Sequence, residues 1–179
     1  RWVVPPEWEE KVQVLPAPVD AAIPLAPVPA ASRRPQIFWS GRLDRQKRVD
    51  LVHAVARALP QVDIRMWGEE VMGQVTPVSA PPANVHRMGT YRSFSDLPLG
   101  ECDLWLYTSA WDGVPSILLE VGMTGIPVVG SLAGGTGEVL DPAHSWPVAG
   151  DDPAAHVAAI EAVLADPRAA RAKAAGLRE

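Results

Sequence analysis

The sequence predicts an α/β protein built on a doubly wound, Rossmann-like parallel sheet. Short apolar segments alternate with segments of helical periodicity, and the apolar segments lack the strict alternation of half-buried strands. Strands of this kind are buried on both faces, as in parallel sheets that helices cover on each side. The chain has 179 residues, 47% of them apolar and 21% charged, which suffices for one domain of ordinary size.

The first part of the chain differs in composition from the rest, because residues 1–35 hold eight of the nineteen prolines. Proline lacks the amide donor and clashes in helix interiors, so residues 16–35 cannot sustain a helix. We therefore expect residues 1–35 to form a linker between domains, with one short strand at 11–15. Residues 36–179 then form the folded domain.

Within that domain the elements follow one another in a regular order. Six short segments are predicted as strands: 36–40, 62–67, 85–88, 103–107, 127–130 and 145–148. Four segments carry helical signals: 49–59, 116–124, a helix from Pro153 and a last, truncated helix over 167–179. Asp152 and Pro153 suit an N-cap and a first helical position, and Val157, Ile160 and Leu164 form the apolar face of that helix. The glycine-rich segment 134–137 is expected to be a turn before a short helix.

Ligands of doubly wound sheets bind beyond the carboxyl ends of the strands. The residues that follow Ser40, Trp67, Met88 and Tyr107 are therefore expected to face the ligand.

Composition and missing motifs exclude several functions. A net charge of −5 gives no basic field for nucleic acid. The single cysteine, Cys102, and four histidines without ligand spacing predict no disulfide and no metal site. The turn after the first strand has one glycine, which disfavours an NAD-linked oxidoreductase, and the P-loop and nucleophile-elbow motifs are absent.

No apolar run is long enough to span a membrane, and these features suit the cytoplasm. Because Arg1 is not a natural start, we expect a fragment of a longer protein.

Two basic residues, Arg42 and Lys47, lie in the turn after the first predicted strand. Arginine offers a planar fork and lysine a point charge to phosphate oxygens, so the pair suits a nucleoside diphosphate. A solvated basic loop is the alternative, because Arg45 and Arg48 lie beside them.

Two acids, Asp112 and Glu120, are eight residues apart around the start of a predicted helix. The amides between them lead into a helix N-terminus, which favours phosphate. An acid in such a site can accept hydrogen bonds from vicinal hydroxyls. Asp112 could instead be a cap or turn residue. Glu120 lies among leucines and valine, so we expect it to have a partner or a ligand.

Two segments resemble motifs of a known family. Residues 40–59 (SGRLDRQKRVDLVHAVARAL) resemble the G-R-L-x-x-x-K segment of family-four retaining glycosyltransferases, which have the GT-B fold. Residues 103–140 (DLWLYTSAWDGVPSILLEVGMTGIPVVGSLAGGTGEVL) resemble the acid-x7-acid signature of the same family and the glycine-rich turn that follows it. The motifs occur in the family's order over residues 11–175, which makes the set more specific than any single motif. The chain is thereby identified as the C-terminal half of a GT-B fold.

The resemblance also implies roles. Arg42 and Lys47 would bind the donor diphosphate, Glu120 the ribose hydroxyls, and Asp112 the hydroxyls of the transferred sugar. Tyr91 stands where the family's backbone meets the base. Four residues would contact the sugar and the distal phosphate through their backbone: Gly113, Val114, Pro115 and Ser116.

Three features depart from the family's pattern. Asp112 replaces the usual glutamate and has a shorter reach. Pro98 and Gly100 compress the helix that usually precedes Asp103. Arg48 replaces a usual glycine, and we expect this to be a surface change.

The implied activity is transfer of a sugar from a nucleotide diphosphate sugar, with retention of configuration and without metal or cofactor. The resemblance also implies a glycan or lipid-linked acceptor and a role in bacterial polysaccharide or glycoconjugate synthesis. It implies in addition an N-terminal Rossmann-like domain, which is missing from this sequence. The isolated chain is then predicted to be inactive. We expect a cytoplasmic protein, with attachment to the inner membrane face as an open alternative. A non-catalytic nucleotide-binding scaffold and a GT-B-fold sugar-nucleotide epimerase are the alternative functions.

Overall fold

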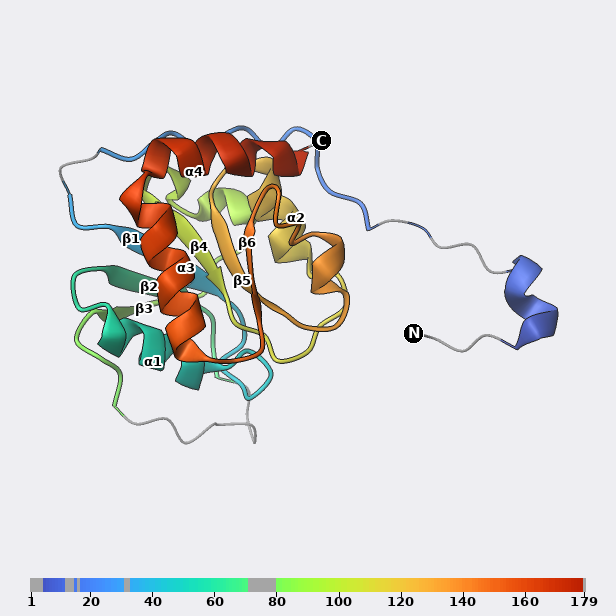
Figure 1. Ribbon diagram of the computed structural model, residues 1–179, viewed down its shortest axis with the longest axis horizontal. Coiled ribbons are helices and arrows are strands. Elements are labelled where there is room, and N and C mark those ends of the chain that lie inside the picture. The colour runs from blue at the N-terminus through green and yellow to red at the C-terminus, as the bar shows by residue number, and fades with distance from the viewer. Residues whose placement is uncertain (1–4, 12–14, 16, 31–32, 71–79, 179) are drawn as a thin grey trace.

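The computed structural model describes residues 5–11, 15, 17–30, 33–70 and 80–178. Within these ranges six parallel strands form one sheet in the order β3-β2-β1-β4-β5-β6, which confirms the predicted α/β class (Figure 1). The strands are β1 (Gln36–Ser40), β2 (Asp63–Trp67), β3 (Val85–Gly89), β4 (Leu104–Tyr107), β5 (Val128–Leu132) and β6 (Trp146–Ala149). Each lies within two residues of its predicted position.

Helical elements cover both faces of the sheet. On one face α1 (Val49–Ala58) and α3 (Pro153–Ala165) pack side by side over the strands (Figure 1). The other face is covered by α2 (Ser116–Met123) and by short 3-10 turns, η2 (Phe94–Asp96), η3 (Leu99–Glu101) and η5 (Ala175–Arg178). The expected compression before β4 is confirmed, since residues 90–103 contain two 3-10 turns and no α-helix. A further 3-10 turn, η4 (Gly134–Glu138), follows β5; the predicted turn is thus present, but the next described element is β6 and not a short helix.

Two helix predictions need correction. The buried residues of α3 are His156, Ile160 and Val163, whereas Val157 and Leu164 are only partly buried. The face is rotated because the ring of His156 enters the core, where its Nε2 lies 2.9 Å from the Ser131 hydroxyl. The last helix was predicted as one element over 167–179, but α4 (Pro167–Ala174) gives way to the 3-10 turn η5.

Part of the proline-rich segment lies against the domain. The Ala26 amide donates to the Thr124 carbonyl at 2.9 Å, and Ile23 and Ala26 pack on the core beside α2. A 3-10 turn, η1, covers Pro6–Lys11. The strand predicted at 11–15 lies largely outside the described residues. No helix in the described part of the chain is both long and apolar enough to cross a membrane.

The strand order determines where a ligand can bind. Chain connections run outward in opposite directions from β1 and β4, which are paired at the centre of the sheet. A crevice forms beyond the carboxyl ends at such a switch point, because the connections leave it uncovered. The segments after Ser40 and Tyr107 meet there, and they carry Lys47 and Asp112.

Candidate functional site

The turn after β1 is organised around a buried carboxylate. The side chain of Asp44 is 1% exposed, and its Oδ1 accepts a hydrogen bond of 3.0 Å from the Lys47 amide. The turn also contacts the end of β2 closely. A Cβ on Gly68 would meet the carbonyl oxygen of Gly41 at 1.8 Å, so only glycine allows this approach.

Arg42 is held at the surface of this turn. Its Nε lies 3.1 Å from Asp44 Oδ2, and one of its terminal nitrogens donates to Gln46 Oε1 at 2.8 Å. The Arg42 side chain remains 56% exposed, so it can reach a ligand in the crevice.

Lys47 and Asp112 form the centre of the site. The Lys47 ammonium lies 2.7 Å from Asp112 Oδ2, and the Tyr107 hydroxyl donates to the same oxygen at 2.8 Å. The Gly113 amide donates to the other oxygen at 3.0 Å. Both charged side chains are largely buried, at 15% and 20% exposure, so Lys47 does not belong to a solvated basic loop.

Protonation at this pair follows from its surroundings. Burial works to raise the pKa of Asp112, but hydrogen bonds from Lys47 and Tyr107 and the charge of Lys47 outweigh it and lower that pKa. Burial raises the pKa of Tyr107, and its bond to Asp112 adds to that effect. At neutral pH the site therefore holds an ionised Asp112 and a protonated Tyr107 that donates to it.

Further contacts fix the two loops to each other. The Gln46 side chain donates to the Trp111 carbonyl at 2.8 Å, and the Ala110 amide donates to the Gln46 carbonyl at 2.8 Å. The glycine-rich turn η4 supports the acid from the other side. Gly134 has φ +62, and a Cβ there would meet the Asp112 carbonyl oxygen at 1.9 Å. Asp112 is thus a fixed part of a packed loop and does not cap α2.

The start of α2 has no side-chain cap. Its N-cap position is Pro115, which makes no side-chain capping bond, so the amides that follow lack that partner. Gly113 and Ser116 are exposed, and Val114 is partly exposed. The predicted contact residues Gly113–Ser116 therefore lead from Asp112 into the helix N-terminus.

Glu120 lies on α2, and among the described residues no hydrogen bond or ion pair links it to the Lys47–Asp112 pair. Among the described residues its carboxylate has no hydrogen-bond or ion-pair partner, and burial raises its pKa. The expected protein partner is thus absent from the described part of the chain. A ligand contact stays a prediction.

A cavity of about 220 Å³ lies beyond the ends of β1, β2 and β3. Arg42 and Tyr91 contribute to its walls, and the Tyr91 hydroxyl lies 3.3 Å from that of Ser40. The other lining residues follow the same strand ends: Gly41, Trp67, Gly68, Glu69 and Thr90. Residues predicted to face a ligand after Ser40, Trp67 and Met88 therefore meet around one cavity.

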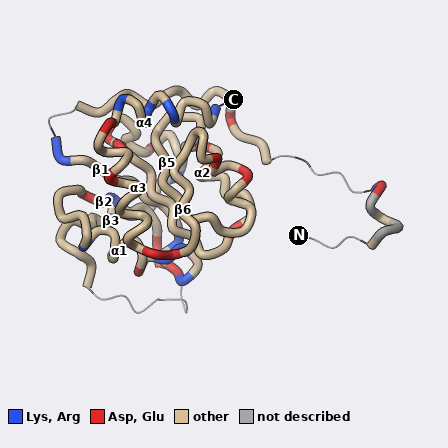
Figure 2. The backbone as a smooth tube through the Cα atoms, in the orientation of Figure 1, with Lys and Arg blue, Asp and Glu red and all other residues tan. Residues whose placement is uncertain are grey.

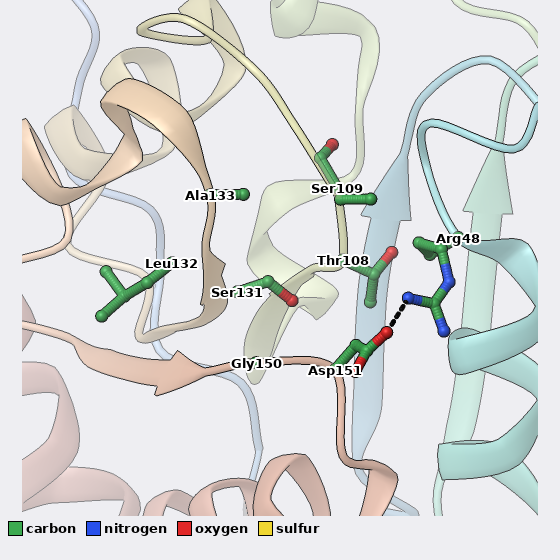
Figure 3. Close-up of a pocket in the computed structure, with 9 residues that line it drawn as sticks. Arg48, Thr108, Ser109, Ser131, Leu132, Ala133, Gly150 and Asp151 are labelled. Atoms are coloured by element: carbon green, nitrogen blue, oxygen red, sulfur yellow. Dashed lines mark hydrogen bonds and ion pairs between the residues drawn. The ribbon is translucent and has the colours of Figure 1, made fainter. Parts of the chain in front are cut away.

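Arg48 is not the surface change that the sequence suggested. It has φ +54, a left-handed conformation in which glycine would be unstrained. Its side chain is 21% exposed and pairs with Asp50 at 2.9 Å and with Asp151 at 2.6 Å. Figure 3 shows the Arg48–Asp151 pair at the side of a small cavity of about 140 Å³. Acidic and basic residues also lie side by side at this edge of the sheet in Figure 2, near the start of α3.

Sequence reasoning missed three residues of the site. Asp44 could have been found, because an aspartate in a turn commonly accepts a hydrogen bond from a backbone amide a few residues later in the chain. Tyr107 was recognised as the end of a strand but not as a partner of Asp112. Nothing in the sequence pointed to Gln46.

These observations define a Rossmann-like domain whose switch-point crevice presents two cations, a fixed acid and a helix N-terminus without a side-chain cap. The chain belongs to the glycosyl transferases of group 1, whose family model matches residues 34–166. No curated protein matches the chain by sequence.

Solved structures share the fold. HepE from Anabaena, solved in complex with UDP, is 21% identical with a TM-score of 0.69 over 83% of this chain and 44% of its own. Sucrose-phosphate synthase from Thermosynechococcus elongatus is 20% identical with a TM-score of 0.78 over 93% of this chain and 46% of its own. TarM is 17% identical with a TM-score of 0.67 over 87% of this chain and 33% of its own. This chain therefore spans less than half the length of each of these proteins.

Proposed function

We propose that the chain is the donor-binding half of a glycosyltransferase that takes its sugar from a nucleoside diphosphate sugar. One observation carries the proposal: Lys47 and Asp112 meet at the switch point, beside Arg42 and the start of α2. HepE, which shares the fold, has been solved with UDP and with UDP-glucose.

The proposed mechanism depends on charge at the diphosphate. Negative charge develops on the leaving diphosphate as the bond to the sugar breaks, and Arg42, Lys47 and the amides that begin α2 stabilise it. We propose that these groups suffice without a metal ion, and that transfer of a hexose proceeds with retention of configuration. Asp112 holds hydroxyls of the sugar, and Glu120 holds those of the ribose. The cavity beside Tyr91 receives the base.

Donor binding has to separate Lys47 from Asp112. A diphosphate competes with Asp112 for the ammonium, and the sugar hydroxyls then become partners of the released carboxylate. Binding of the two parts of the donor is thereby coupled, because each part compensates one member of the broken pair.

A complete enzyme needs more than this domain. We propose that an N-terminal Rossmann-like domain supplies the acceptor side, and that the acceptor is a glycan or a lipid-linked glycan in bacterial polysaccharide or glycoconjugate synthesis. A cytoplasmic location, at or near the inner membrane face, fits such an acceptor. The domain alone then binds the donor and transfers nothing.

Calorimetric titration of the chain with UDP, GDP and ADP tests the proposal. We expect saturable binding of one nucleotide, and loss of about tenfold or more in affinity in Arg42→Ala and Glu120→Ala variants, since each removes a charged hydrogen-bond partner. Arg168→Ala serves as the control, because Arg168 lies on α4. Equal affinity in all variants would refute the assigned site.

Glu120 should stabilise the complex with the nucleotide but destabilise the folded domain in the absence of ligand. Its carboxylate is harder to ionise in the folded protein than in the unfolded chain, because burial raises its pKa above the ordinary value of 4.5. Glu120→Gln should therefore raise the melting temperature at pH 7 by roughly 1–2 °C and weaken nucleotide binding. The gain should vanish below the ordinary pKa, where both states are protonated. Thermal unfolding at pH 7 and pH 4 checks this, and an unchanged difference between the two pH values would contradict it.

A further inference from the structure

The buried carboxylate of Asp44 has no role in the mechanism described above. We infer that Asp44 is a positioning residue, which holds Arg42 and Lys47 in the geometry that a diphosphate requires. The inference rests on the proposed function, because it concerns the same diphosphate.

Asp44 contacts both cationic residues through different oxygens. Its Oδ1 accepts from the Lys47 amide at 3.0 Å, which fixes the backbone from which the lysine side chain extends. Its Oδ2 forms an ion pair with Arg42 Nε at 3.1 Å. That oxygen accepts no well-directed hydrogen bond from any residue that the structure describes. Arg42 is therefore the charge that compensates a carboxylate which is almost completely buried.

A buried carboxylate is costly unless it is paired and hydrogen-bonded. An acid beside two diphosphate-binding cations also repels the diphosphate, so its charge by itself weakens donor binding. What Asp44 can contribute is order. With Nε held by Asp44 and a terminal nitrogen by Gln46, Arg42 loses less rotamer freedom when a ligand arrives.

Loss of the charge and loss of the positioning contact thus predict opposite changes in nucleotide affinity for Asp44→Asn. Removing a negative charge alone would tighten nucleotide binding, whereas loss of position loosens it. The test compares the diphosphate that binds best among UDP, GDP and ADP with its monophosphate, by calorimetry on the full chain. The ratio of the two affinities reports on contacts to the distal phosphate, and damage to the fold alone would weaken both ligands together.

We expect Asp44→Asn to reduce this affinity ratio about tenfold, the loss that one mispositioned charged contact commonly causes. The matched control is Asp50→Asn, which removes a charge that pairs with Arg48 instead. Its ratio should stay unchanged. Asp44→Ser is the second variant, because serine can still accept from the Lys47 amide but cannot pair with Arg42. It should show the same loss even if the asparagine variant is poorly folded.

The possible failures can be distinguished. If the unaltered chain binds no nucleotide, the proposed function fails and the role of Asp44 fails with it. If the chain binds nucleotide and the affinity ratio of a folded Asp44 variant is unchanged or increased, the positioning role alone is overturned.

Discussion

Transfer from the nucleotide sugar is expected to fall about 10²–10³-fold when Lys47 is replaced by methionine in the proposed two-domain enzyme. The Lys47 ammonium lies at the switch point, largely buried, where it would meet the diphosphate. A positive charge fixed in such a site stabilises the leaving group far more than a solvated one would. Methionine retains most of the apolar stem but removes the ammonium, which lies 5.6 Å from the centre of the Tyr107 ring.

The measurement is kcat and KM for the donor at saturating acceptor. If Lys47 acts on the leaving group, kcat falls more than KM rises. Lys173→Met is the matched control, because Lys173 lies on α4 over the ring of Trp146. A loss confined to KM would show that Lys47 only binds the donor, and a loss of twofold or less would remove it from the mechanism.

Asp112→Asn should tighten binding of the bare nucleoside diphosphate while abolishing the advantage of the sugar-bearing donor. In this structure Asp112 pairs with Lys47 at 2.7 Å, so a diphosphate that binds the ammonium would have to displace the carboxylate. Asparagine removes the competing charge, so we expect affinity for the diphosphate to rise about three- to tenfold. The same variant loses the carboxylate that would accept hydrogen bonds from the sugar, so the two ligands should bind about equally.

Titrations with UDP and UDP-glucose, or with the corresponding pair for the base that binds, measure both effects. Asp141→Asn is the control, because it removes an exposed acid that neighbours His144. Weaker binding of the bare diphosphate would contradict the proposed competition. A sugar advantage that survives the substitution would show that Asp112 does not hold the sugar.

Much of the fold could be predicted because its signals are local. Most of the six strands are short apolar segments followed by glycine or a polar residue, and Asp152 caps α3 through a 3.0 Å bond from the Ala154 amide, as expected. The apolar face of α3 was misplaced because His156 is buried through a bond to Ser131 on a distant strand. A contact of that kind has no signature near residue 156.

The site was predictable in part for the same reason. The general rule for parallel sheets places Arg42, Lys47 and Asp112 at one edge, but only the pairing of β1 with β4 brings Lys47 onto Asp112. Arg48 shows the limit most clearly. Its side chain bonds to Asp151, which is 103 positions away in the sequence. Its backbone is left-handed, and arginine is not a residue that signals such a conformation.

A competing ligand site would lie at the opposite edge of the sheet, beyond the amino ends of the strands. A cavity of about 650 Å³ is bounded there by Pro35 and Asp103, which precede β1 and β4, and by residues 28–30 and 164–168. It is larger than the cavity beside Tyr91, so size alone would favour it.

Backbone amide shifts during titration with the nucleotide that binds locate the site directly. We predict saturable shifts at Gly41, Arg42, Tyr91, Gly113 and Ser116, around the switch point. Shifts confined to residues 28–30 and 164–168 would place the nucleotide at the opposite edge and contradict the assignment of the donor site.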